Sequence, residues 1–310
     1  MMQEILFTVI YALVALILPP LCLGVIRKVK ARLQNRIGAP VWQPLFDLFK
    51  LLRKQETLSD TASWVFRFAA VFNCSAAIYL AVTVPWLVPS PVSMIGLDIF
   101  MLLYLLAAMR LFTLLAAMDT GSAFGAFAAS REATLSFLVE PVAMLSLVSL
   151  AVVTPSTQLG AIFAFTESAA SRPALWVIAG TAILLASLVE LSRMPIDDPT
   201  THLELTMVHE AMLLEASGKN LALFEYANSL KLAVLFGLSA QCFLHAMPIM
   251  LNATSQAIAS VGALLALCIA VGAFESVAVK LNWRKAPEFI AYGITLALVG
   301  AIMAVGSLGL

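Results

Sequence analysis

Charged residues are scarce in this sequence, and their scarcity excludes a soluble globular protein. Only 12% of the 310 residues are charged, whereas 62% are hydrophobic, and the mean hydropathy is +0.98. A composition of this kind is typical of proteins that fold within a lipid bilayer. Positive and negative side chains balance at 18 each, so no basic face indicates a nucleic acid as partner.

Residues that hold metals or catalyse reactions are also few. The cysteines Cys22, Cys74, Cys242 and Cys268 stand singly. Without a CxxC pair they predict neither a zinc site nor an iron–sulfur cluster, and we expect them to be buried apolar residues. His202 and His209 stand seven apart, in no recognised metal motif. No serine has a paired histidine and aspartate, and no glycine-rich loop opens a helix. We therefore expect no metal, no cofactor and no catalytic residue in this chain itself.

Long apolar runs are abundant instead. A hydrocarbon core of ~30 Å needs roughly 20 mostly apolar residues per helical span, and eight stretches meet this requirement. They lie near Ile5–Val25, Phe68–Val88, Leu97–Met118, Leu135–Val153, Leu175–Leu191, Leu230–Leu251, Ile258–Val279 and Phe289–Leu308. The sequence predicts an all-α integral membrane protein, a single membrane domain over residues 1–310 with eight transmembrane helices.

Lysine and arginine gather in alternate loops. Nearly all of those between spans follow the first, third, fifth and seventh spans, and the opposite loops carry only Arg172. Positive charge stays on the cytoplasmic side of a membrane. The asymmetry therefore predicts that the two long loops, 26–67 and 192–220, are cytoplasmic and that both termini lie outside.

The first of these loops contains an amphipathic stretch, VWQPLFDLFKLLRK. Its apolar residues recur at helical spacing (Leu45, Leu48, Phe49 and Leu52), and its charged residues occupy another face (Asp47, Lys50 and Lys54). This pattern predicts a helix at the membrane surface with Pro44 in its first turn. A generic surface anchor has the same pattern, so the pattern alone leaves the role of the helix open.

Ionisable residues occur where charge is expensive. An ionised side chain in a span costs from ~2.5 kcal/mol upward, and the predicted spans contain Arg110, Glu140, Glu190 and Glu275. Asp119, Arg131 and Glu132 are expected in the loop between the third and fourth spans, and Glu225 at the entry to the sixth. Together they predict a polar cavity that opens from the cytoplasmic side and carries protons. The alternative is a set of structural ion pairs, with the residues near span ends reaching toward the headgroups.

Three motifs support a family resemblance. The first is ARLQNRIGAPVWQPLFDLFKLLRKQE (Ala31–Glu56), and the second is MDTGSAFGAFAASREATLSFLVEP (Met118–Pro141). The third is an E-x-x-R-x-P-x-D pattern that starts at Glu190 and ends at Asp197. In this order they resemble the NuoH-type membrane subunit family of respiratory complex I. The second motif, and Glu275 after Phe274, are most similar to the branch in group 4 NiFe hydrogenases and formate hydrogenlyase.

The resemblance implies a non-catalytic subunit of an oxidoreductase complex in a prokaryotic inner membrane. Its implied partners are a NiFe-type large subunit, iron–sulfur small subunits and antiporter-like membrane subunits; whether quinone binds stays open. It implies a proton or sodium path formed by Glu140, Glu190, Glu204, His202, Asp197, Glu275 and Arg110. It implies docking of a peripheral redox arm, or a quinone-like cavity, at Arg36, Gln43, Asp47, Lys50, Asp119, Arg131, Glu132 and Arg193.

Two positions depart from the complex I pattern. Thr200 and His202 stand where complex I members have carboxylates, and only Glu204 keeps one. The departure favours a hydrogenase-like subunit over a quinone-chamber subunit, with His202 as a substitute proton-transferring group. An independent secondary transporter is a further alternative, but no inverted repeat relates the two halves of the chain.

Overall fold

The computed structural model describes residues 2–59, 61–87, 97–164, 172–197, 208–247 and 253–306. Within these ranges eight helices are long and apolar enough to cross a membrane, which confirms the predicted all-α membrane fold. Those helices are α1 (Met2–Leu33), α3 (Trp64–Thr83), α4 (Ile99–Asp119), α5 (Ala123–Val153), α8 (Pro173–Glu190), α10 (Gly218–His245), α11 (Ala253–Val277) and α12 (Ala286–Gly306). The shorter elements are α2 (Gln43–Arg53), α6 (Leu159–Ala164), α9 (His209–Met212) and the 3-10 turn η1 (Trp283–Lys285).

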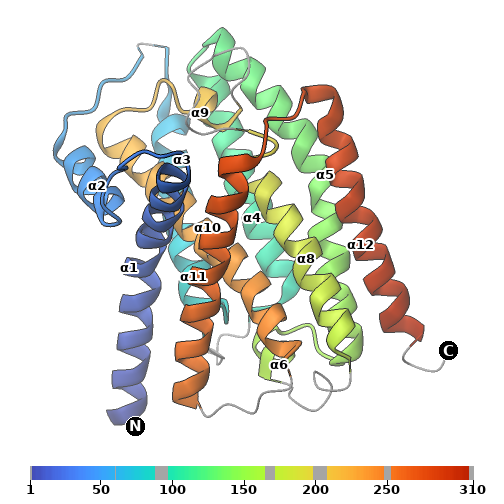
Figure 1. Ribbon diagram of the computed structural model, residues 1–310. Helices are drawn as coiled ribbons and strands as arrows, with labels where there is room; N and C mark the ends of the chain where they lie inside the picture. Colours follow the sequence, from blue (N-terminus) through green and yellow to red (C-terminus); the bar gives the residue numbers. More distant parts are fainter. Residues whose placement is uncertain are drawn as a thin grey trace.

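The spanning helices form one bundle around α10 (Figure 1). α10 packs against α1, α3, α8 and α11, and α12 packs against α5 and α8. Helices satisfy their own backbone hydrogen bonds, which a bilayer requires because lipid supplies no partners. The start of α1 and the last turn of α12 lie at one end of the bundle, and α2 and α9 lie at the other, hereafter the α2 end (Figure 1).

Two spanning helices begin earlier than the hydropathy predicts. α5 begins at Ala123 and α10 at Gly218, each about three turns before the predicted span. The predicted loop position of Arg131 and Glu132 is therefore wrong, because both lie on α5. Their charges lower the local hydropathy, but alanine favours helix along this stretch, and the fold gives both side chains contacts.

The amphipathic helix of the first loop is confirmed as α2. Pro44 stands in its first turn and is buried against the bundle, where α2 contacts α10 and α1. Trp42 just before the helix and Phe46 and Phe49 within it face outward, with exposed fractions of 57%, 59% and 63%. α2 thus has one apolar face against the bundle and a second, aromatic face that no described residue covers.

The turn between α4 and α5 is joined to the start of α3. Gly121 follows α4 with φ +66°, a backbone conformation that glycine adopts without strain. The Asp119 carboxylate accepts hydrogen bonds from the backbone N–H and the hydroxyl of Ser63, both at 2.7 Å. Ser63 in turn caps α3 by accepting from Val65 N–H at 3.2 Å. Asp119 therefore fixes the ends of two spanning helices relative to each other.

Candidate functional site: a buried ion-pair network

An ion-pair cluster joins four spanning helices. Arg110 lies on α4, Glu140 on α5, Glu190 at the end of α8 and Lys231 on α10. The Arg110 guanidinium donates one hydrogen bond to Glu140 at 2.7 Å and another to Glu190. Lys231 donates to the other carboxylate oxygen of Glu190 at 3.2 Å and to its backbone carbonyl at 3.1 Å. We call these four residues the central cluster.

The central cluster is buried except at one member. The side chains of Arg110 and Glu190 are each 7% exposed, whereas that of Glu140 is 52% exposed. Charges removed from water need close partners of opposite sign, and each buried member has at least one. The Glu140 side chain lies at the lateral surface of the bundle, so the central cluster extends from the interior to that surface.

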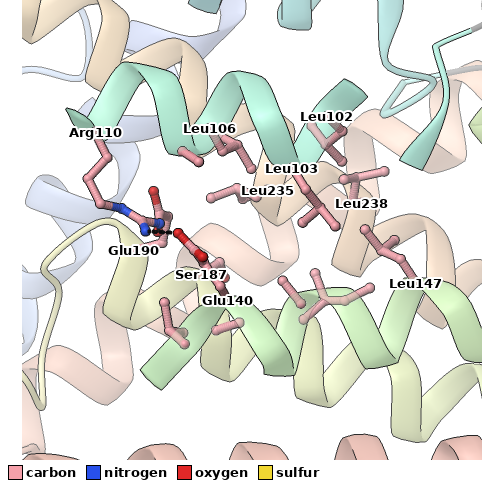
Figure 2. Close-up of a pocket in the computed structure, with 15 residues that line it drawn as sticks. Leu102, Leu103, Leu106, Arg110, Glu140, Leu147, Ser187, Glu190, Leu235 and Leu238 are labelled. Carbon is pink, nitrogen blue, oxygen red and sulfur yellow. Dashed lines mark hydrogen bonds and ion pairs between the residues drawn. The ribbon is translucent and has the colours of Figure 1, made fainter. Parts of the chain in front are cut away.

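A leucine-lined pocket adjoins the central cluster (Figure 2). Arg110, Glu140 and Glu190 lie together at one end, and leucines extend away from them (Figure 2). These leucines are Leu102, Leu103 and Leu106 of α4, Leu147 of α5, and Leu235 and Leu238 of α10. An apolar lining gives water and ions no partners. The polar interior of the described helices therefore does not continue along this pocket.

A second ion-pair group lies toward the α2 end. Arg193, three residues after α8, donates to Glu275 of α11 at 3.1 Å. The ammonium group of Lys30, on α1, lies 3.9 Å from the other oxygen of this carboxylate. Only 1% of the Glu275 side chain is exposed, so these cations compensate a fully buried charge.

Asp197 belongs to the same region. It accepts a hydrogen bond from Lys280 at 2.5 Å and another from the Val208 backbone N–H at 2.9 Å. Its side chain is 2% exposed. Asp197 thereby joins the end of the α8 segment to the start of α9 and to the chain after α11.

A polar cavity of about 290 Å³ lies among these groups. Its charged lining residues are Arg27, Lys30, Arg193, Asp197, Glu210, Glu225 and Glu275. A cavity of about 200 Å³ adjoins it and shares Leu23, Arg27 and Glu225 with it. The second cavity is bounded by α2 through Pro44, Asp47, Leu48 and Leu51. The cavity beside α2 therefore gives access to the larger, charged cavity.

A smaller cavity of about 30 Å³ separates the larger one from the central cluster. Arg110, Glu132 and Lys231 line it on one side, and His209 and Asn228 line both this cavity and the larger one. Burial, and next the ammonium charge of Lys231, lower the pKa of the His209 imidazole from 6.5 to about 4. His209 is therefore neutral at neutral pH, with one ring nitrogen that donates and one that accepts.

The residues assigned to the ion path fall into two groups. Arg110, Glu140 and Glu190 come together in the central cluster, and Asp197 and Glu275 line the larger cavity. His202 and Glu204 lie outside the described residues, as does Thr200.

The residues assigned to docking separate more widely. Gln43, Asp47 and Lys50 lie on α2, where Gln43 donates to Asp47 at 2.8 Å, and Arg36 lies in the loop between α1 and α2. Arg131 lies over the ring of Phe127 at 4.0 Å and near that of Trp283 at 5.5 Å. Asp119, at the end of α4, is hydrogen-bonded to Ser63 at the start of α3. Glu132 and Arg193 are buried in the interior.

Four partners were not identified from the sequence. Lys231, Lys280, Lys30 and His209 all contribute to the network. For Lys231 the sequence contains an indication, because this residue stands at the edge of a predicted span and an ionisable residue in a span needs a partner of opposite charge. No pattern in the sequence specifies which carboxylate each lysine meets.

The arrangement of these groups is suited to charge transfer. Within the described ranges, no group of three or more His, Cys, Asp or Glu side chains could hold a metal ion. A proton relay uses carboxyl groups and neutral imidazoles that lie beside polar cavities, and this site contains both kinds of group.

Comparison with known proteins places this network in context. A profile described as NADH dehydrogenase matches residues 5–306. Two Escherichia coli K12 proteins are each 34% identical to the chain: hydrogenase-4 component C over 77% of this chain and 75% of its own length, and formate hydrogenlyase subunit 4 over 78% of both. A chain of the membrane-bound sulfane sulfur reductase, an archaeal respiratory membrane complex, superposes with TM-score 0.78 at 19% identity, covering 97% of this chain and 99% of its own. The similarity to the reductase chain shows that the two chains share a fold.

Proposed function

The chain belongs to the NADH dehydrogenase family, and we propose that it is the membrane-anchor and coupling subunit of an energy-converting complex. The complex is of the group 4 NiFe hydrogenase or formate hydrogenlyase type; the two relatives at 34% identity, which are named hydrogenase-4 component C and formate hydrogenlyase subunit 4, support this proposal. The partner subunits carry the iron–sulfur clusters and the NiFe centre, and this chain provides the start of a proton or sodium path.

One observation carries the proposal. Ionisable groups follow one another from the cavities beside α2 to the half-exposed Glu140, through four helices of a membrane bundle. Placing so many charges inside a membrane protein is costly, and a purely structural role requires neither the cavities nor the exposed end. The charge distribution between loops supports a cytoplasmic α2 end, so that the path begins there.

Glu140 is the proposed exit of the path. Apart from Ser187, the described residues of the leucine-lined pocket offer no polar side chain beyond the central cluster, whereas Glu140 reaches the side of the bundle. The proposed path therefore leaves laterally toward an antiporter-like membrane subunit and does not cross this chain.

The surface of α2 is the proposed docking site for the peripheral arm. Lys50 on α2 and Arg36 in the loop before it are exposed, and we expect Arg36→Glu with Lys50→Glu to release the arm from membranes. Lys285→Glu, which changes an exposed charge in η1, is the control. Retention of the arm by the double variant, measured by membrane fractionation, would contradict this assignment.

Purification of the native complex tests the proposed function as a whole. We expect co-purification of a large subunit that contains nickel, together with iron–sulfur subunits, and ion movement after reconstitution in liposomes. A complex whose large subunit has no nickel would exclude the hydrogenase assignment and leave the fold intact. Ion transport by the isolated chain would identify an independent transporter.

A quinone-chamber subunit is the second candidate, favoured by the cavity beside α2. A quinone needs an apolar sleeve for its tail and a donor for its carbonyl oxygens. Pro20, Leu23 and Leu48 fit the first requirement and Arg27 the second. Quinone found in the purified complex, and lost in an Arg27→Ala variant, would favour this candidate.

A further inference from the structure

Glu132 differs from every other carboxylate of the network. Its residue is 5% exposed, and its Oε2 atom accepts no hydrogen bond from any residue that the structure describes. Both oxygens of Glu190, by contrast, are engaged by Arg110 and Lys231. A buried carboxylate without hydrogen bonds is costly in its charged form.

The cations around Glu132 pair with other carboxylates. Those that act on it come from Arg110 on α4, Glu190 on α8, Lys231 on α10 and Asp197 after α8. Asp197 is neutralised by Lys280. Arg110 donates to Glu140 and Glu190, and Lys231 donates to Glu190, so neither of these cations is shown to donate a hydrogen bond to Glu132.

The small cavity gives Glu132 access to water. It has room for about two water molecules. Two further polar atoms of its lining residues, Arg110 Nε and Asn228 Oδ1, also have no partner among the described residues. A water molecule needs two to four such polar partners. The neutral His209 and Asn228 connect this cavity with the larger one beside it.

We propose that Glu132 is the carboxyl group that binds and releases the transported proton, and that Glu190 is a fixed anion held between Arg110 and Lys231. This inference rests on the proposed function. A proton from the larger cavity crosses the waters beside His209 and converts the Glu132 carboxylate to a carboxylic acid. Glu132 and the central cluster together then carry no net charge, and release of the same proton gives them one net negative charge.

Infrared difference spectroscopy of the purified complex tests the protonation directly. We expect a protonated-carboxyl band at neutral pH in wild type that disappears in Glu132→Gln and persists in Glu288→Gln, which removes an exposed carboxylate at the start of α12. Glu132→Asp should retain a band. Glu190→Gln should also remove it, because Arg110 and Lys231 then lose the buried carboxylate that they share and stabilise the ionised form of Glu132 instead.

Ion movement in reconstituted liposomes separates this inference from the proposed function. We expect at least about tenfold slower ion movement in Glu132→Gln, with partial recovery in Glu132→Asp. An unchanged band or an unchanged rate in Glu132→Gln overturns the role of Glu132 and leaves the proposed function standing. A wild-type complex that moves no ions overturns the proposed function, while the infrared result still decides whether Glu132 holds a proton. A complex in which sodium replaces the proton shows no band and overturns the inference.

Discussion

Arg110 is the one guanidinium that contacts two carboxylates of the central cluster. It donates to Glu140 and to Glu190 from within the bundle. Removing one partner of a buried ion pair leaves an uncompensated charge and costs about 3–5 kcal/mol. We therefore expect Arg110→Met to destabilise the detergent-solubilised protein by this amount, measured by thermal denaturation.

The exposed pair of Arg67 and Glu56 provides the control. Its N–O distance is 3.1 Å, and the Arg67 side chain is 65% exposed. Solvent screens such pairs, which contribute less than about 1 kcal/mol. If Arg67→Met and Arg110→Met were equally destabilising, the central cluster would have no special role in stability.

His209 makes the stability of the protein depend on pH. Its folded-state pKa of about 4 lies below the unfolded value of 6.5, so the unfolded state binds more protons between these values. The stabilisation is complete above pH 6.5 and is lost as the pH falls toward 4. The difference between the folded-state and unfolded-state pKa values corresponds to on the order of 3 kcal/mol in the free energy of unfolding. We expect His209→Gln to match wild type at pH 8 and to lose less stability at pH 5, measured by thermal denaturation at both values.

At the residue scale, the sequence predicts which residues matter better than how they pair. Arg110, Glu140 and Glu190 stand out because ionisable groups in spans are rare. Low hydropathy placed Glu132 in a loop, and the family resemblance assigned it to docking. Its burial depends on α4, α9 and α10, which pack around it. Such contacts join residues far apart in the chain, and no local pattern encodes them.

At the scale of elements, close helix packing depends on glycine at one position of α10. A Cβ atom on Gly237 would lie 2.6 Å from the Cβ of Trp86. Trp86 is fully buried, donates to the Ala81 carbonyl at 2.8 Å and accepts from Gln241 at 3.1 Å, so it has little freedom to move. We expect Gly237→Ala to destabilise the protein by about 1–3 kcal/mol.

Gly262 of α11 is the matched control for this element. A Cβ atom there meets no atom within 4 Å, and alanine is the better helix former. Thermal denaturation of the two alanine variants should therefore show a loss for Gly237 and none for Gly262. Equal effects would mean that backbone propensity, rather than contact with Trp86, decides the outcome.

The elements themselves were largely predictable because bilayer thickness fixes their length. Eight spans and α2 follow from apolar runs and helical spacing. The errors concern the starts of α5 and α10, where turns that contain charged side chains are helical although their hydropathy is low. The helices α6 and α9 are too short for a periodic pattern to indicate them.

At the scale of the whole molecule, the lateral surface around Glu140 requires a cover. A half-exposed carboxylate on a spanning helix is unfavourable against lipid, and Phe137 beside it on α5 is 79% exposed. Ile258 of α11 is similarly exposed, at 75%, on a helix whose outward face shows no comparable charge among the described residues. A partner subunit that supplies polar groups is the cover that the Glu140 surface needs.

Labelling with a lipid-soluble maleimide tests this requirement in native membranes. A cysteine introduced by Phe137→Cys should be protected when the membrane partners are present and should react when their genes are deleted. A cysteine introduced by Ile258→Cys reports the reaction rate of a residue in contact with lipid in each preparation. Deletion of the partners should therefore raise the labelling rate of Phe137→Cys, relative to that of Ile258→Cys, by at least about tenfold, because a protein interface excludes the lipid phase. Rapid labelling of Phe137→Cys in the intact complex would place Glu140 against lipid and remove the lateral exit from the proposed path.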